Sequence, residues 1–187
     1  MAFAKKKLTD NQIEVRAMKA GLPLAKPKEL VKKKTRRTLE QKTAAQLMEP
    51  ADNAYSRYIR LRDSELIGDE WIGQCISCPR VLVVVDRYGK WIASSQNGHF
   101  ISRGVYSLRF NEFNTNLQCA HCNAWRDKED MLEGYRKGLA LKYGEDTVTE
   151  LKQLSKAPDA YKRPKKPELL QIIADCKLWV NERLDIA

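Results

Sequence analysis

Hydrophobic residues form one strand-like run near the middle of the chain and helix-like repeats on both sides of it. Val81–Val85 is a β-branched run, and it is followed by a turn at Asp86–Gly89 and a second short run at Lys90–Ala93. This order predicts a β-hairpin in which Gly89 takes a positive φ. We expect this hairpin to pack on the core of the domain.

A helix is predicted on the N-terminal side, over residues 54–66. Pro50 forms a boundary, and Asp52 or Asn53 can serve as the N-cap of this helix. Ala54, Tyr58, Leu61 and Glu65 recur at helical spacing and share one face of it. A shorter, partly helical segment is expected at Leu39–Met48.

Three more helices are predicted in the last third of the chain. The first carries hydrophobic residues from Met131 to Leu139 and stops at Gly144, and the second covers residues 148–154. The third starts at Pro167, and its apolar side consists of Leu169, Ile172, Ile173, Cys176, Trp179 and Val180. This stripe could close the core of the monomer, with Cys176 as a buried packing thiol, or form a homodimer.

Positive charge is concentrated in the first quarter of the chain. The net charge of the 187 residues is +10, from 34 Lys+Arg and 24 Asp+Glu. Residues 1–50 hold 13 of those cations and 5 of the anions, which leaves 21 and 19 for the rest. Such a basic arm suits a polyanion, although a solvated tail has the same composition. The candidate DNA contacts in it are Lys32, Lys33, Lys34, Arg36 and Arg37.

Membrane insertion and secretion are not expected. No run approaches the roughly 20 apolar residues of a membrane span, and the first residues have no apolar segment of a secretory signal. We therefore expect a cytoplasmic protein, in a compartment where disulfides are rare.

Two Cys-x-x-Cys pairs carry the strongest chemical signal in the chain. Cys75 and Cys78 form the first pair, and Cys119 and Cys122 form the second. Two such turns supply the four thiolates of a closed tetrahedral zinc site. Two disulfides or a redox pair are the alternatives, but a reducing compartment disfavours the former and the second matching pair disfavours the latter. A structural Zn²⁺ is therefore predicted.

Polar residues with catalytic potential lie between and beside these pairs. His99 stands between them on a predicted short strand, Asn114 precedes Cys119 by five residues, and Asn123 directly follows Cys122, where a helix should begin. Taken alone, His99 is more typical of a structural histidine than of a catalyst. The order His, Asn, Asn around a zinc core is what changes this interpretation.

In these residues the chain resembles the HNH, or His-Me finger, nucleases of the endonuclease VII type. It is most similar to the NinG (Rap) recombination nucleases of lambdoid phages over about residues 55–155. The motifs are Cys75–Cys78, Gly98–Phe100, Leu108–Asn114, Gln118–Asn123, Tyr135–Arg136 and Tyr143–Glu145. The resemblance implies an α+β fold with a zinc-bound treble-clef ββα core, a β-hairpin and flanking helices. The expected parts are a basic arm (1–50), a nuclease core (51–130) and a helical region (131–187).

The resemblance also implies a role for each site residue. His99 would be the general base that takes a proton from the attacking water, and Asn114 would hold the His99 loop in place. Asn123 would bind a catalytic Mg²⁺ or Mn²⁺. Arg103 and Arg109 would clamp the scissile phosphate with their guanidinium groups.

The chain departs from the endonuclease VII pattern at Gly98, where a metal-binding Asp is expected. The second metal ligand is therefore open. Asp127 is the first choice because it stands at i+4 from Asn123 on the expected helix, and Gln96 or Asn97 are further candidates. His121, inside the second cysteine pair, is expected to be an exposed spacer or phosphate contact.

The function that these features favour is a metal-dependent, structure-selective endonuclease. Its substrates would be branched recombination intermediates of double-stranded DNA, such as Holliday junctions and D-loops, in the cytoplasm of the bacterial host. A homodimer would suit the paired cuts that a four-way junction needs. The alternative is a zinc-stapled nucleic-acid-binding protein without catalysis.

Overall fold

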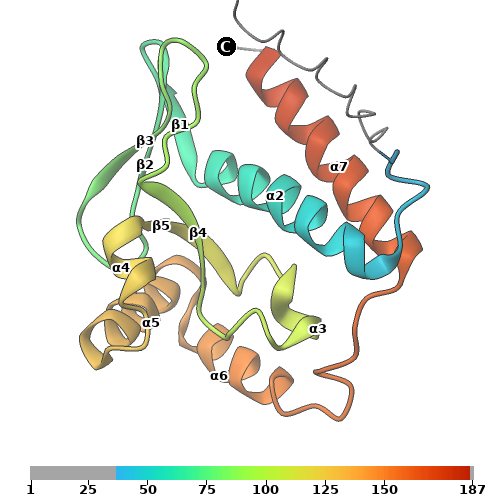
Figure 1. Ribbon diagram of the computed structural model, residues 1–187. Helices are drawn as coiled ribbons and strands as arrows, with labels where there is room; N and C mark the ends of the chain where they lie inside the picture. Colours follow the sequence, from blue (N-terminus) through green and yellow to red (C-terminus); the bar gives the residue numbers. More distant parts are fainter. Residues whose placement is uncertain (1–36, 186–187) are drawn as a thin grey trace, which may run out of the picture. The chain divides into compact units, whose positions relative to one another are not determined.

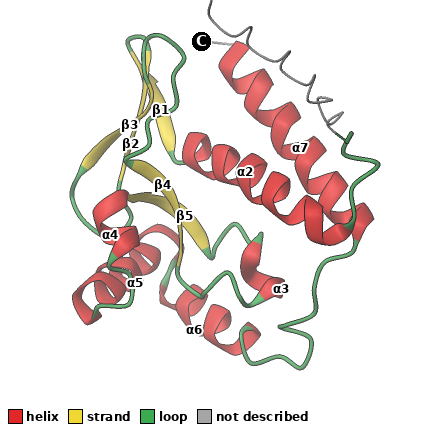
Figure 2. Ribbon diagram, viewed as in Figure 1, coloured by secondary structure: helices red, strands yellow, loops and turns green. Residues whose placement is uncertain are grey.

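The computed structural model describes residues 37–185, so Lys32, Lys33, Lys34 and Arg36 lie outside the described residues. Arg37, the first described residue, is exposed. The elements, in chain order, are α2 (Ala44–Arg62), β1 (Ser64–Ile67), β2 (Glu70–Gln74), β3 (Val81–Val85), β4 (Ser95–His99), α3 (Tyr106–Arg109), β5 (Thr115–Cys119), α4 (Ala120–Ala124), α5 (Glu129–Tyr143), α6 (Glu145–Leu154) and α7 (Lys166–Asp185). Helices and two small antiparallel sheets thus give the expected α+β class (Figures 1 and 2).

Strands β1, β2 and β3 form one sheet in that order, and this differs from the predicted hairpin. The predicted second strand at Lys90–Ala93 contributes only an isolated bridge between Val85 and Trp91, and β3 pairs along its length with β2. The β1–β2 hairpin was not predicted, because the helix was expected to continue to residue 66, into β1. Gly68 has a φ of 65° in the turn between the two strands. The positive φ expected at Gly89 is present, at 73°.

The N-terminal helix is longer than predicted and continues through Pro50. Its N-cap is Thr43, which forms a capping box with Gln46. Pro50 cannot donate the backbone hydrogen bond to the Gln46 carbonyl. Leu47 and Ala51, on either side of it, are fully buried, and their packing offsets this loss. Asp52 and Asn53 are therefore helical rather than N-caps.

The same helix ends earlier than predicted, at Arg62, and the chain enters β1 at Ser64. Glu65 and Leu66 were predicted on the helix but belong to this strand. Asp63 is the C-cap, and its carboxylate accepts hydrogen bonds from Arg62 and from the backbone of Leu117 on β5. The bond to Leu117 on the distant strand β5 turns the chain out of the helix. The periodicity of the sequence around residue 63 gives no sign of this contact.

Helix α7 closes the core of the monomer. Leu169, Ile173, Cys176 and Val180 of its apolar side are buried, and the first three pack against α2 residues such as Leu47 and Ile59. These apolar residues are therefore buried within one chain and do not need a dimer interface to cover them. No helix among the described residues is long and apolar enough to cross a membrane.

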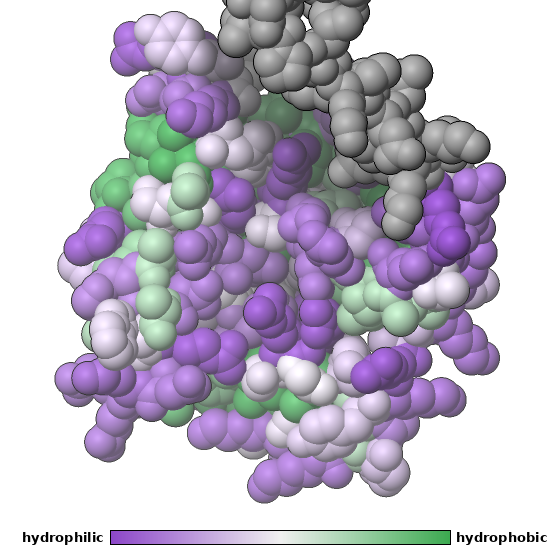
Figure 3. Space-filling model, viewed as in Figure 1, coloured by the Kyte–Doolittle hydropathy of each residue, from purple (hydrophilic) through white to green (hydrophobic). Residues whose placement is uncertain are grey.

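The two-stranded sheet β4–β5 lies between two groups of helices (Figure 1). Its register pairs Gln96 with Gln118 and His99 with Thr115. Residues of β4 alternate between its two sides: Ser95 hydrogen-bonds to Arg60 of α2 on one side, and Gln96 hydrogen-bonds to Asn123 of α4 on the other. Figure 3 shows a mainly hydrophilic face, with hydrophobic residues gathered at the three-stranded sheet.

Candidate active site and metal centre

Four cysteine sulfurs converge at the junction of the two sheets. The Sγ atoms of Cys75, Cys78, Cys119 and Cys122 all lie within 4.8 Å of one another, and no disulfide joins them. Tetrahedral zinc with Zn–S bonds of about 2.3 Å needs sulfurs about 3.8 Å apart, and Cys78 and Cys119 are 4.0 Å apart. This donor set could bind Zn²⁺. Burial raises the pKa of Cys75 to about 11; a bound Zn²⁺ would act against this shift, because it stabilises the thiolate.

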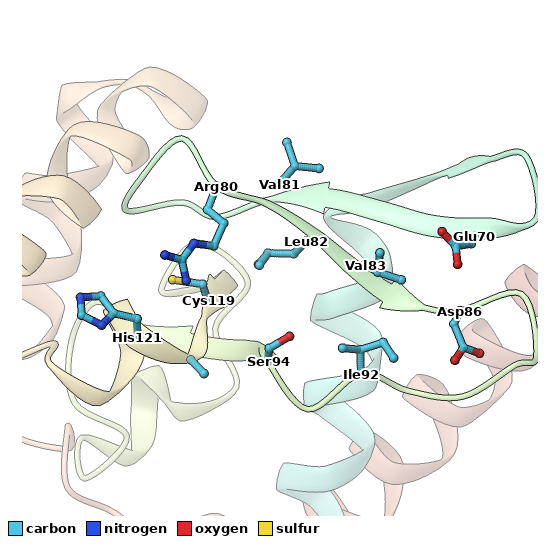
Figure 4. Close-up of a pocket in the computed structure, with 11 residues that line it drawn as sticks. Glu70, Arg80, Val81, Leu82, Val83, Asp86, Ile92, Ser94, Cys119 and His121 are labelled. Atoms are coloured by element: carbon cyan, nitrogen blue, oxygen red, sulfur yellow. The ribbon is translucent and has the colours of Figure 1, made fainter.

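A pocket of about 460 Å³ opens beside this cluster, with Cys119 in its wall (Figure 4). Arg80, at the start of β3, projects toward Cys119 and His121. His121 is exposed and is not part of the four-sulfur cluster, as its predicted spacer role requires. Because His99 does not line this pocket, the pocket lies beside the four-cysteine cluster and apart from the candidate catalytic residues.

His99 is the last residue of β4, and its ring is held by a backbone carbonyl. Nε2 of His99 lies 3.1 Å from the carbonyl oxygen of Arg109. A carbonyl only accepts hydrogen bonds, so Nε2 carries the proton and the lone pair of the neutral ring is on Nδ1. Burial lowers the pKa of His99 to about 4; the Arg109 carbonyl opposes this shift, and the charges of Arg126 and Arg103 add to it. His99 is therefore a neutral base at pH 7.

Asn114 ties the loop after His99 to the strand. It is fully buried; its Oδ1 accepts from the backbone N–H of Ile101 at 2.7 Å, and its Nδ2 donates to the carbonyls of Ile101 and Leu108. These side-chain-to-backbone bonds hold the loop at Ile101. The contribution of Asn114 to catalysis stays a prediction.

Helix α5 supports the same strand through Tyr135. The Tyr135 hydroxyl donates to the carbonyl of Gly98 at 3.0 Å. The helix itself lies against the first cysteine turn through two glycines: a Cβ at Gly134 would be 2.4 Å from the Ser77 carbonyl, and one at Gly138 would be 2.0 Å from that of Ile76. The position of α5 is thus fixed by both the zinc module and the His99 strand.

Arg109 is occupied by protein groups, which argues against its predicted role as a phosphate clamp. Its guanidinium pairs with Asp52 of α2 through two hydrogen bonds and donates to the Arg103 carbonyl at 2.9 Å. Its side chain is only 13% exposed. Arg109 instead positions the carbonyl that holds His99. Arg103 is exposed and has no ion pair among the residues from 37 to 185.

Asn123 lies on α4, as expected, and contacts β4. Its Nδ2 donates to Oε1 of Gln96 at 2.7 Å, which leaves Asn123 Oδ1 free to bind a cation. The helical placement predicted for Asp127 is wrong, because α4 ends at Ala124. Asp127 lies in the following turn with its side chain 95% exposed and 3.5 Å from Arg126. Gln96 is therefore better placed than Asp127 to join Asn123.

Gly98 is required by the side chain that packs on it. A Cβ at position 98 would lie 2.1 Å from Oε1 and 2.8 Å from Cδ of Gln118. Gln118 is buried on β5, and its Nε2 donates to the Ser77 hydroxyl at 2.8 Å. The space that an Asp at position 98 would use is thus filled by Gln118.

Substitution of Gly98 by alanine is expected to lower the free energy of unfolding by about 1–3 kcal/mol, as overpacking of a filled core does. Denaturant unfolding measures this change. Gly104→Ala is the control, since its Cβ would meet only the Ser102 hydroxyl, at 3.7 Å. The effect of Gly98→Ala should shrink in a Gln118→Ala background. Equal losses in both backgrounds would show that Gln118 is not the obstacle.

Sequence reasoning missed several residues that build this site. Asp52 was read as an N-cap, Gln118 was part of a motif without a role, and Arg126 was not considered. Their contacts join segments far apart in the chain, such as α2 with α3. The sequence marked Gln118 only through its place in the motif that ends at Asn123 and through the separate motif that begins at Gly98.

Comparisons with known proteins place the chain in a family. The family model described as "NinG: Bacteriophage Lambda NinG protein" matches residues 4–182. A search of curated proteins and a search of solved structures each found no match.

Proposed function

Because this chain belongs to the NinG family of phage proteins, we propose that it is a metal-dependent, structure-selective DNA endonuclease. Its substrates are branched recombination intermediates such as Holliday junctions and D-loops. The observation that carries the proposal is the contact of His99 Nε2 with the Arg109 carbonyl. This contact leaves the lone pair of a neutral imidazole on Nδ1, where it can accept a proton from water.

In this reaction His99 Nδ1 takes the proton from a water molecule as that water attacks the scissile phosphorus. The bond from phosphorus to the 3′-oxygen breaks, and the 3′-oxygen leaves. Asn114 keeps the loop at Ile101 in place, so His99 is pre-positioned for the water. Arg103 and Arg126 place positive charge around His99, which favours a phosphate there.

Asn123 and Gln96 are the residues that would hold a catalytic Mg²⁺ or Mn²⁺. Asn123 would offer its free Oδ1, and Gln96 Oε1, which already accepts from Asn123 Nδ2 at 2.7 Å, would use its second lone pair. Hard cations prefer such amide oxygens, and Mg²⁺ keeps several waters, so that few protein ligands suffice. When bound, the ion would stabilise the negative charge on the leaving 3′-oxygen. The four sulfurs of Cys75, Cys78, Cys119 and Cys122 would hold a structural Zn²⁺ and leave no open coordination position.

Substitution of Asn123 by alanine is expected to raise the Mg²⁺ concentration for half-maximal cleavage by about tenfold or more, as loss of a metal-site partner does. Gln96→Ala should act in the same direction. Asp127→Ala should not, because Asp127 lies beyond the end of α4 and is exposed. Titration of cleavage with Mg²⁺ measures all three. A shift confined to Asp127→Ala would move the metal site to the turn.

The function is tested by incubating the full chain with an end-labelled four-way junction and Mg²⁺. Specific nicks near the branch point are expected, and a linear duplex of the same sequence should be cut far less. A chain that binds the junction but cuts no branched DNA with Mg²⁺ or Mn²⁺ would instead be a non-catalytic zinc-stapled DNA-binding protein.

The remaining assignments follow from the same proposal. Lys32, Lys33, Lys34, Arg36 and Arg37 form a basic arm that neutralises phosphates of the DNA. Two copies of the chain would place two His99 sites on opposed strands of a symmetric junction. Sedimentation of the protein with and without a junction measures that stoichiometry.

A further inference from the structure

Two arginines of α2 share one tryptophan at a distance from His99. Arg57 and Arg60 stand three residues apart, so they lie on neighbouring positions of one helix face. Their guanidinium carbons lie 5.4 Å and 4.9 Å from the ring centroid of Trp91. Trp91, just after the turn that follows β3, thus holds two cations close together.

No carboxylate of the described residues neutralises this pair. Neither Arg57 nor Arg60 takes part in an ion pair within residues 37–185. Arg60 is half-buried and donates only to neutral oxygens, the Ile92 carbonyl at 2.7 Å and the Ser95 hydroxyl at 2.9 Å. Its Nε is buried without a hydrogen-bond partner. Burial and the charge of Arg57 lower the pKa of Arg60 to about 10.

The other half-buried arginines of the domain are paired. Arg62 binds Asp63 through two hydrogen bonds, and Arg109 binds Asp52 in the same way. Withdrawing a charge from water is unfavourable unless it is paired. Arg60 is therefore a half-buried cation that lacks an anion within residues 37–185, and the exposed Arg57 lies beside it on the same tryptophan. Two adjacent guanidinium groups without a carboxylate are the arrangement of a phosphate site.

The pair lies along the same strand as His99. Helix α2 runs beside β4, with Arg60 bonded to Ser95 at one end and Asp52 bonded to Arg109, the residue that holds His99, at the other. Arg60 and Asp52 are eight residues apart, about 12 Å along a helix. A DNA strand carries one phosphate per about 3.4 Å of axis, so this separation corresponds to a few nucleotides.

We propose that Arg57 and Arg60, held on Trp91, bind a backbone phosphate of DNA a few nucleotides from the phosphate cleaved at His99. This inference rests on the proposed function, since it takes the ligand of the pair to be the same nucleic acid. The contact is to the backbone and independent of base sequence. It would set how the strand enters the site, and it takes no part in the chemistry.

The test is the salt dependence of binding to a fluorescently labelled four-way junction, without added Mg²⁺. Arg57→Gln removes an exposed charge and should leave the fold intact. It is expected to weaken binding several-fold and to lower the slope of log K against log salt by about 0.9, the value for one phosphate contact. Arg60→Lys keeps the charge but loses the fork and its two bonds, and it should weaken binding as well.

Arg183→Gln is the matched control. Arg183 is also exposed and stacks on tryptophans, with its guanidinium carbon 5.1 Å from the ring centroid of Trp71, but it lies on α7. The slope of log K against log salt for Arg183→Gln should stay at the wild-type value. Tight wild-type binding with an unchanged slope in Arg57→Gln would overturn the phosphate site alone. Absence of DNA binding by the wild-type chain would overturn the proposed function together with this site.

Discussion

Replacement of His99 by alanine is expected to slow junction cleavage by about 10²–10⁴-fold, the usual contribution of a positioned general base. The four-cysteine cluster and the fold should persist, because His99 lies at the end of β4 and its side chain contacts a carbonyl rather than the zinc ligands. Single-turnover cleavage under saturating Mg²⁺ measures the rate, and circular dichroism and zinc content report the fold.

The chain contains one other histidine, and it provides a matched control. His121→Ala removes an exposed ring from the second cysteine turn, and it should leave the cleavage rate close to that of the wild type. If His99→Ala cuts at the wild-type rate, His99 is not the base. If both variants lose activity equally, the zinc module and not the base is being tested.

The pH dependence of the reaction follows from the depressed pKa of His99. The base must be neutral, so kcat/KM should fall only near pH 4 and not near 6.5, the ordinary pKa of histidine.

The same depressed pKa makes the stability of the fold depend on pH. Below pH 6.5 the unfolded chain binds a proton at His99 that the folded chain does not. Stability is therefore full above pH 6.5 and is lost as pH falls toward 4, by up to about 3 kcal/mol. The loss should be absent in His99→Ala.

Removal of one zinc ligand is expected to have the largest effect on stability. Cys119→Ser should reduce bound zinc from one equivalent to a small fraction and abolish cooperative unfolding. The apparent free energy of structural zinc in small domains, roughly 10–16 kcal/mol, is as large as the whole stability of a typical domain. The cluster also sits in one core with Leu61, Trp71 and Leu117, so its loss exposes hydrophobic residues. Metal analysis and thermal unfolding measure both effects.

The fifth cysteine supplies the control for that experiment. Cys176 is buried between α7 and α2, apart from the four-sulfur group. Cys176→Ser should keep one equivalent of zinc and lose only the stability of a buried thiol. Retention of zinc in Cys119→Ser would exclude the four-cysteine site.

The four-cysteine cluster and the α+β class could be predicted because their signals are local in sequence. Two residues between cysteines fix a turn in which both sulfurs face one point, wherever the rest of the chain goes. Gly144, predicted to end a helix, caps α5 with a φ of 96°. A residue without a side chain adopts this φ without strain. Such features depend on a few adjacent residues.

The errors occurred where distant contacts outweighed local preference. Pro50 normally marks a helix end, but the burial of Leu47 and Ala51 against α7 keeps α2 continuous. Arg109 looked like a free phosphate ligand, and only the fold shows that Asp52, 57 residues away, already holds it. The helical placement of Asp127 was wrong for a different reason, since it assumed a helix that in fact ends at Ala124. Sequence periodicity does not contain these tertiary partners.

The contact of α5 with the first cysteine turn has an evolutionary consequence. Since the backbone of α5 touches the carbonyls of Ile76 and Ser77 through Gly134 and Gly138, any larger residue at either position must push the helix outward. Tyr135 would then move away from Gly98 and release the strand that bears His99. If His99 acts as proposed, homologues that cleave DNA should have inherited glycine at both positions, and lineages without that activity would be free to drift there.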